Sequence, residues 1–198
     1  MRILYLDCFF GFDASMLLGA LIDAGADPDA MEGMDIRYSK TLRSSIECTS
    51  AYVASCDTGE TAYSHIFESA EPSQGTTPSS IKAVVAALKQ LGIEYIMCSD
   101  IGICDGTDGE VLAVLEGAGI EALPSDGENI SVFPADVRFL AAIVNETGPK
   151  PAMDILAIGY GAGGTDVSST HLLTAFIGEY NPEELFDRVE YEEIASYL

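Results

Sequence analysis

The chain has 198 residues, 48% of them hydrophobic, so it can bury about 70% of its unfolded surface in one domain or two small lobes. Its formal net charge of −23, from 32 acidic and 9 basic residues, repels phosphate backbones and argues against nucleic-acid binding. No apolar run reaches the roughly 20 residues of a membrane helix. Met1 and Arg2 lead straight into a strand, without a signal-peptide layout. We therefore expect a cytoplasmic protein that binds neither nucleic acid nor membrane.

The opening segment places polar side chains at the end of a strand. Apolar residues 3–6 predict a strand that ends in Asp7 and Cys8, and Gly11 supplies a turn. A helix is expected over about Asp13 to Ala24. Sites in open α/β sheets form at this edge, and anions favour the positive end of a helix. The segment is therefore the first candidate site.

Strands and helices mix without strict alternation along the rest of the chain. This pattern predicts an α+β (mixed α/β) fold, a mixed β-sheet with flanking helices. One domain over 1–198 is expected, with about 1–72 and 79–198 as alternative lobes. Ser79 or Ser80 is expected to cap one helix, and Asn181 a terminal helix. The expected strands are 35–40, 46–56, 94–101, 154–160 and 171–177, and the expected helices are 81–92, 110–115 and 134–145.

The cysteines and the acidity each leave alternatives open. The five cysteines are scattered, with no CxxC pair, which argues against a zinc finger or a dithiol redox motif. Buried free cysteines behave as small hydrophobes, so packing is their simplest use. The acidity reflects either a salt-rich cytoplasm, where repulsion is screened, or a surface that concentrates divalent cations near a site.

A second motif lies at residues 158–163, which read Ile-Gly-Tyr-Gly-Ala-Gly. Glycines at alternate positions let the backbone approach a ligand or another segment closely. Gly159, Gly161 and Gly163 are therefore either cofactor-binding or packing residues. No helix is expected directly after them, so they do not form a dinucleotide fingerprint.

These two motifs together resemble the LarC family, whose members insert nickel into the pincer cofactor of lactate racemase. The match covers residues 4–9 and 18–21 with Asp23, and residues 158–163 in full. The resemblance implies nickel insertion or delivery to a pyridinium mononucleotide in nickel-pincer cofactor biosynthesis. Such a reaction would be of the lyase or chelatase type. Whether this chain is itself an enzyme is left open by the sequence.

The chain departs from the family pattern at residues that carry chemistry. Phe10 replaces a serine of the family's turn, and the family's turn carboxylate falls on Ser15. Either Asp13 takes that role two residues earlier, or the role is lost. The family's histidine-rich stretch has no counterpart, and His65 and His171 are the chain's two histidines. Because imidazole is a good nickel ligand, its scarcity leaves carboxylates and thiolates as the candidate ligands.

The candidate site residues follow from this reasoning. The predicted metal ligands are Asp7, Cys8, Cys98 and Cys104, and the predicted catalytic residues are Asp7 and Asp13. If the strands before Cys8 and Cys98 are neighbours in one sheet, their carboxyl ends converge there. A mixed Cys/Asp set of this kind can hold a transition metal.

The resemblance also leaves a second interpretation open. The resemblance implies that full family members carry a C-terminal nucleotide-using domain, and we expect this domain to be absent here. The chain would then be a catalytically degenerate member that acts as a binding or scaffold subunit. The implied partners are a small-molecule cofactor precursor and either further copies of the chain or a protein that carries the missing domain.

Overall fold

A computed structural model describes residues 1–56, 75–125, 132–163 and 171–181. Over these ranges seven strands form one mixed sheet in the order β2-β3-β8-β9-β1-β4-β7, and β5 pairs separately with β6. The predicted α+β class is confirmed. The strands are β1 (Arg2–Asp7), β2 (Met34–Arg43), β3 (Ile46–Cys56), β4 (Tyr95–Cys98), β5 (Ile101–Ile103), β6 (Ala122–Pro124), β7 (Glu146–Thr147), β8 (Asp154–Ala162) and β9 (Leu172–Glu179). The helices are α1 (Ala14–Asp23), η1 (Pro28–Ala30), α2 (Pro78–Gln90), α3 (Gly109–Ala118) and α4 (Pro134–Ile143).

Strand β1 lies inside the sheet and is buried on both faces. It runs parallel to β4, with Leu6 opposite Cys98, and antiparallel to β9. β1 and β4 are therefore neighbours in the sheet, and their carboxyl ends meet. Strands from 1–56 and from 95–179 interleave in this one sheet. No helix in the described ranges is both long and apolar enough to cross a membrane.

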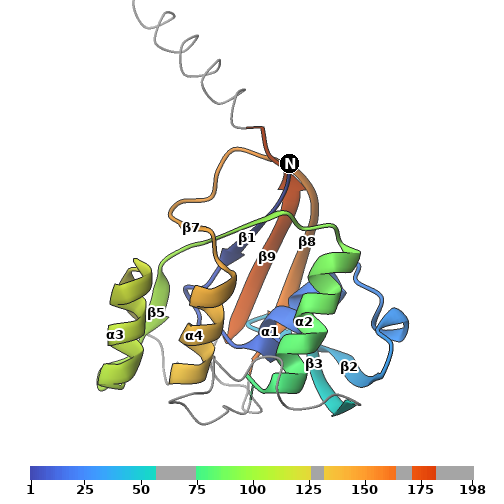
Figure 1. Ribbon diagram of the computed structural model, residues 1–198, viewed down its shortest axis with the longest axis horizontal. Helices are drawn as coiled ribbons and strands as arrows, with labels where there is room; N and C mark the ends of the chain where they lie inside the picture. Colours follow the sequence, from blue (N-terminus) through green and yellow to red (C-terminus); the bar gives the residue numbers. More distant parts are fainter. Residues whose placement is uncertain (57–74, 126–131, 164–170, 182–198) are drawn as a thin grey trace, which may run out of the picture.

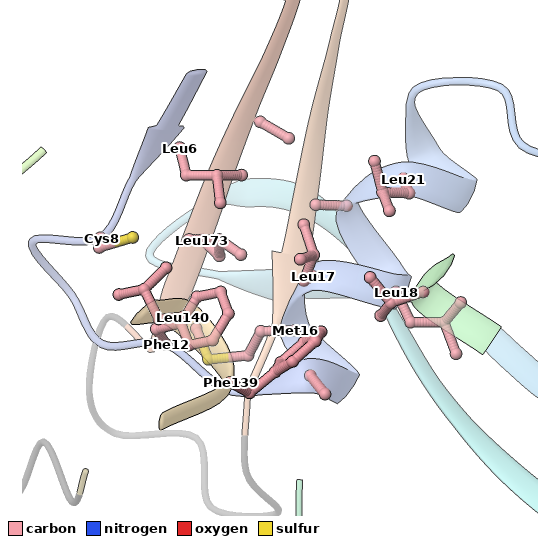
Figure 2. Close-up of a cluster of buried hydrophobic side chains, with 14 of the residues drawn as sticks. Leu6, Cys8, Phe12, Met16, Leu17, Leu18, Leu21, Phe139, Leu140 and Leu173 are labelled. Atoms are coloured by element: carbon pink, nitrogen blue, oxygen red, sulfur yellow. The ribbon is translucent and has the colours of Figure 1, made fainter. Parts of the chain in front are cut away.

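The helices form a layer on one face of the sheet, with α1, α2 and α4 in front of the strands (Figure 1). The main core lies between these layers. It joins Leu6 and Leu173 of the sheet to Met16 and Leu17 of α1 and to Phe139 of α4 (Figure 2). These side chains are fully or almost fully buried. Helix α1 therefore packs its apolar side against the strands.

Helix α1 lies unusually close to β8 because the glycine motif offers no side chains on that face. A Cβ at Gly159 would lie 1.9 Å from the carbonyl oxygen of Ala20, and one at Gly161 would lie 1.8 Å from that of Met16. A Cβ at Gly163 would lie 2.6 Å from the sulfur of Met16. Any larger residue at the first two positions would displace the helix backbone.

The end of α1 is fastened to the sheet by Asp23. Its carboxylate accepts hydrogen bonds from the Tyr160 backbone N–H, at 2.9 Å, and from the Thr49 hydroxyl, at 2.8 Å, and it pairs with Lys40. Partial burial opposes ionisation, but the bonds from Lys40, Tyr160 and Thr49 outweigh it and lower the pKa of Asp23. Strands β3 and β8 are joined by one ladder pair, Thr49 with Gly161. Asp23 therefore bridges the two strands where the ladder is short.

Two local predictions were wrong. Helix α2 is capped by Thr77, which accepts from the Ser80 N–H at 3.1 Å, while the Ser80 hydroxyl accepts from the Thr77 N–H at 2.8 Å. Ser80 is thus the N3 residue of a capping box whose N-cap is Thr77, and neither Ser79 nor Ser80 is the N-cap. The strand expected over 94–101 is interrupted at Ser99 and Asp100, and β5 joins a separate pair. The predicted terminal helix and His65 lie outside the described residues.

We expect Gly161→Ala to destabilise the protein strongly, because its methyl group would overlap the backbone of α1. Forced overpacking of this kind costs about 1–3 kcal/mol or more. Urea unfolding followed by circular dichroism measures the change in the free energy of unfolding. Gly117→Ala is the matched control: Gly117 lies inside α3, where an added Cβ would meet nothing within 4 Å, so it should stabilise by up to about 1 kcal/mol. Equal unfolding midpoints for the two variants would contradict the packing role of the motif.

Candidate functional site

The candidate site begins where β1 and β4 end side by side. The Ser99 N–H donates to the Leu6 carbonyl at 2.8 Å, and the Cys8 N–H donates to the Ser99 hydroxyl oxygen at 2.8 Å. These hydrogen bonds extend the contact between β1 and β4 beyond their last paired residues, Leu6 and Cys98. They bring Cys8 and Cys98 into the main core on the helix-covered face, where both are fully buried.

The environment of Cys8 favours its neutral thiol form. The hydrogen bond with Cys98, followed by burial and the nearby Asp7 charge, raises the pKa of the Cys8 thiol well above its ordinary value. Metals bind the thiolate rather than the thiol. A metal ion at this pair would therefore have to displace at least one proton.

Asp7 belongs to the opposite face of β1. Its Oδ1 accepts from the Phe9 N–H at 3.3 Å, and along the strand it follows Tyr5, whose hydroxyl donates to the Gly148 carbonyl at 3.1 Å. Burial, and then the negative charge of Asp7 with that of neighbouring groups including Asp100, raises the pKa of Tyr5 to about 12. Asp7 and Cys8 therefore diverge, although they are adjacent in sequence.

Cys104 lies past β5, in the turn before α3. There the Thr107 hydroxyl donates to the Cys104 carbonyl at 2.7 Å, and the thiol lies 3.9 Å from the same hydroxyl. In the described part of the chain, no three His, Cys, Asp or Glu side chains are grouped so as to hold a metal ion. Cys8 and Cys98 lie in one buried cluster. Neither Asp7 nor Cys104 forms a group of three possible ligands with them. Metal binding by these residues stays a prediction.

Asp13 caps the first turn of α1. Its carboxylate accepts from the Met16 N–H at 2.8 Å, and a Cβ at Gly75 would lie 2.1 Å from its Cγ. The segment before α2 holds this turn, since the Ala14 N–H donates to the Thr76 hydroxyl oxygen at 3.0 Å. Burial, with a further contribution from Asp136, raises the pKa of Asp13 to about 6. This carboxyl is thus tuned to exchange a proton near neutral pH, which is compatible with its predicted catalytic role.

Asp136 is a buried acid that the sequence reasoning did not single out. It is 1% exposed in the first turn of α4, and its Oδ2 accepts from the Phe133 N–H at 2.9 Å. The available signal was Pro134 followed by an acid two residues later, since proline and acidic residues both favour a helix start. The sequence pattern could not predict that the start of α4 lies near the start of α1, where Asp136 acts on Asp13.

On the face of β8 toward α1, close packing explains the glycines of residues 158–163. Gly159 and Gly161 face α1, and the Gly163 N–H donates to the His171 carbonyl at 3.2 Å. Their cofactor-binding role stays a prediction, and the face toward α1 is already filled.

Comparison with known proteins identifies the family. The family model described as "Nickel insertion protein" matches residues 4–83 and 79–195. Because this match covers most of the chain, the protein belongs to the nickel insertion protein family, as its two motifs predicted.

Relatives of known description share low identity over nearly the whole chain. A putative nickel insertion protein of Roseiflexus castenholzii is 24% identical over 92% of this chain and 61% of its own length. The pyridinium-3,5-bisthiocarboxylic acid mononucleotide nickel insertion protein of Geobacillus kaustophilus is 25% identical, over 90% of this chain and 60% of its own. A putative nickel insertion protein of Desulfotalea psychrophila is 28% identical, over 100% and 65%. The chain thus spans 60–65% of these relatives' length. No solved structure matches it.

The raised pKa of Asp13 predicts a pH-dependent stability. An acid whose pKa rises from 3.8 to about 6 on folding stabilises fully below pH 3.8, and this contribution is lost as the pH rises through 6. Asn also caps helices and carries no charge. We therefore expect the free energy of unfolding of Asp13→Asn to exceed that of the wild type by up to about 3 kcal/mol at pH 8. This difference should be smaller by about 1 kcal/mol at pH 5.

Unfolding free energies measured from pH 5 to pH 8 check this expectation. Asp27→Asn is the control, because Asp27 is an exposed cap on η1 that accepts from the Asp29 N–H. A gap for Asp13→Asn that stays constant over the pH range, as for the control, would show that Asp13 ionises normally.

Proposed function

We propose that this chain takes part in nickel insertion into a pyridinium mononucleotide, within nickel-pincer cofactor biosynthesis. The chain belongs to the nickel insertion protein family, and relatives are named for insertion of nickel into pyridinium-3,5-bisthiocarboxylic acid mononucleotide. The observation that carries the proposal is the placement of Cys8 and Cys98 in one buried cluster at the paired ends of β1 and β4. Nickel is the cargo in this function.

The thiol pair would supply soft donors to nickel once deprotonated. Because the hydrogen bond with Cys98 and burial raise the pKa of the Cys8 thiol, binding would release protons and strengthen with pH. Asp7 lies on the opposite face of the same strand end, so it would join the ligand set or accept a released proton only after the strand end rearranges. Cys104 would join only after a rearrangement of the strand-end loops, because the described residues hold no group of three ligands. Asp13 would serve as the acid or base of the reaction.

A second candidate function is a binding or scaffold subunit that keeps the fold without the chemistry. It is favoured by the complete burial of Cys8 and Cys98 and by the packing of Gly159 and Gly161 on α1. In this role the chain would associate with further copies or with a partner that supplies the remaining region of the relatives. Asp7 would then be a cap for the Phe9 N–H.

Equilibrium dialysis of the reduced protein against nickel separates the two candidates. For nickel insertion we expect saturable binding whose affinity rises about tenfold per pH unit between pH 6.5 and 8.5 for each proton released. The Cys8→Ala, Cys98→Ala double variant should lose this binding. Cys48→Ala is the matched control, because Cys48 is equally buried but belongs to a separate cluster with Ala162 and Leu172. Equal binding by the wild type and the double variant would remove the thiol pair from the function and favour the scaffold.

A further inference from the structure

The outer edge of the sheet is a long strand that is paired on one side. Within the described residues β2 pairs with β3 and with no other strand, so it lies at one margin of the sheet (Figure 1). Its pairing has one register irregularity, between Asp35 and Ile36, and is regular from Ile36 to Arg43. In an edge strand every second residue directs its backbone N–H and C=O away from the neighbouring strand. Strand β2 therefore presents a long, regular edge to which a further strand can pair.

The usual protection of such an edge is weak in this strand. Proteins guard exposed edges with charged side chains, above all lysine. Lys40 lies in the middle of the regular stretch, but its ammonium group is paired with Asp23 at the end of α1, which balances its charge. Tyr38 and Leu42, two residues before and after it on the same face, are 52% and 60% exposed. The edge therefore offers apolar side chains together with its backbone groups.

The hairpin of β2 and β3 differs in charge from the rest of the chain. Residues 34–56 carry three basic side chains against two acidic ones, whereas the whole chain has a net charge of −23. Elsewhere the excess of acidic side chains makes two copies of the protein repel each other. A second copy meets no such excess at this hairpin, so the hairpin is where two copies can approach.

The sequence of β2 is complementary to itself about Ser39. When two copies of the strand pair antiparallel about a two-fold axis at Ser39, Ile36 lies opposite Leu42 of the second copy. Tyr38 then lies opposite Lys40, whose aliphatic stem can pack on the ring, and cross-strand pairs of both kinds stabilise a sheet. An axis one residue earlier would set Ile36 opposite Lys40, and an axis one residue later would set Lys40 opposite itself, which is unfavourable. The side chains therefore select the axis at Ser39.

We propose that β2 is a homodimer interface, at which two copies pair antiparallel about Ser39 and join their sheets into one. The contact is isologous, because each copy presents the same strand, and it closes at two copies. Strands β1 and β4, with Cys8 and Cys98, lie toward the other margin of the sheet. The interface is therefore independent of the proposed function and of the thiol pair.

Sedimentation velocity of the full chain over about 1–100 µM tests the dimer. We expect a monomer–dimer equilibrium. Tyr38→Lys removes the ring and sets like charges opposite each other at two points of the interface, so the dissociation constant should rise about tenfold or more. Tyr52→Lys is the matched control: Tyr52 is 58% exposed on β3, away from the edge, and the constant should stay within about threefold of the wild type. Circular dichroism checks that both variants are folded.

Disulfide trapping tests the register of the pairing. The two residues on the axis of an antiparallel pair lie directly opposite each other, close enough for a disulfide. Ser39→Cys should therefore form a covalent dimer with oxidised glutathione, seen by electrophoresis without reductant. Thr41→Cys lies on the same strand and face but away from the axis, so its cross-linking should not exceed that of the wild type.

The outcomes separate this interface from other surfaces. A wild-type protein that stays monomeric over the whole concentration range overturns the interface. A dimer that Tyr38→Lys leaves intact, or that Tyr38→Lys and Tyr52→Lys weaken equally, also overturns it, because another surface then holds the copies together. Equal cross-linking of Ser39→Cys and Thr41→Cys overturns the pairing about Ser39. Nickel dialysis tests the proposed function separately from all of these results.

Discussion

The close approach of helix α1 to strand β8 is the constraint on which the rest of the structure depends. Gly159 and Gly161 present no side chain to the helix, so backbone lies directly on backbone. Because α1 follows β1 after one short turn, this contact also sets the position of Asp7 and Cys8. The glycine motif and the opening segment, far apart in sequence, are two halves of a single packing arrangement.

The acidic side chains have a structural use that net charge does not reveal. The chain has 9 basic residues for 32 acidic ones, and several aspartates instead bind backbone N–H groups at turns and helix starts. Such caps satisfy donors that a helix or strand end leaves free. Capping aspartates include Asp7, Asp13, Asp27, Asp108 and Asp136. Part of the acidity therefore belongs to the fold, beside any role in salt tolerance or cation attraction.

Local patterns predicted most elements, and tertiary contacts explain the exceptions. The apolar residues before Asp7 predicted β1, and the helix starts expected at Asp13 and Pro134 agree with α1 and α4. The break after Cys98 could not be predicted, because it depends on Ser99 bonding to a distant backbone N–H of Cys8. The same limit holds at the site: strand pairing brought Cys8 to Cys98, but Asp136 near Asp13 required the position of α4. Sequence indicates which residues are chemically able, while the crossing of elements decides which of them meet.

The place of β1 in the sheet has a consequence for how the chain is made. Its parallel neighbour β4 begins at Tyr95 and its antiparallel neighbour β9 at Leu172. Both edges of β1 are therefore paired only after residues as far along the chain as β9 have been synthesised. Contacts of such long range form slowly and leave strand edges open in the meantime. Until β4 and β9 are made, β1 and α1 are apolar segments without their partners in the sheet. Exposed apolar surface and unpaired strand edges of this kind are what chaperones bind.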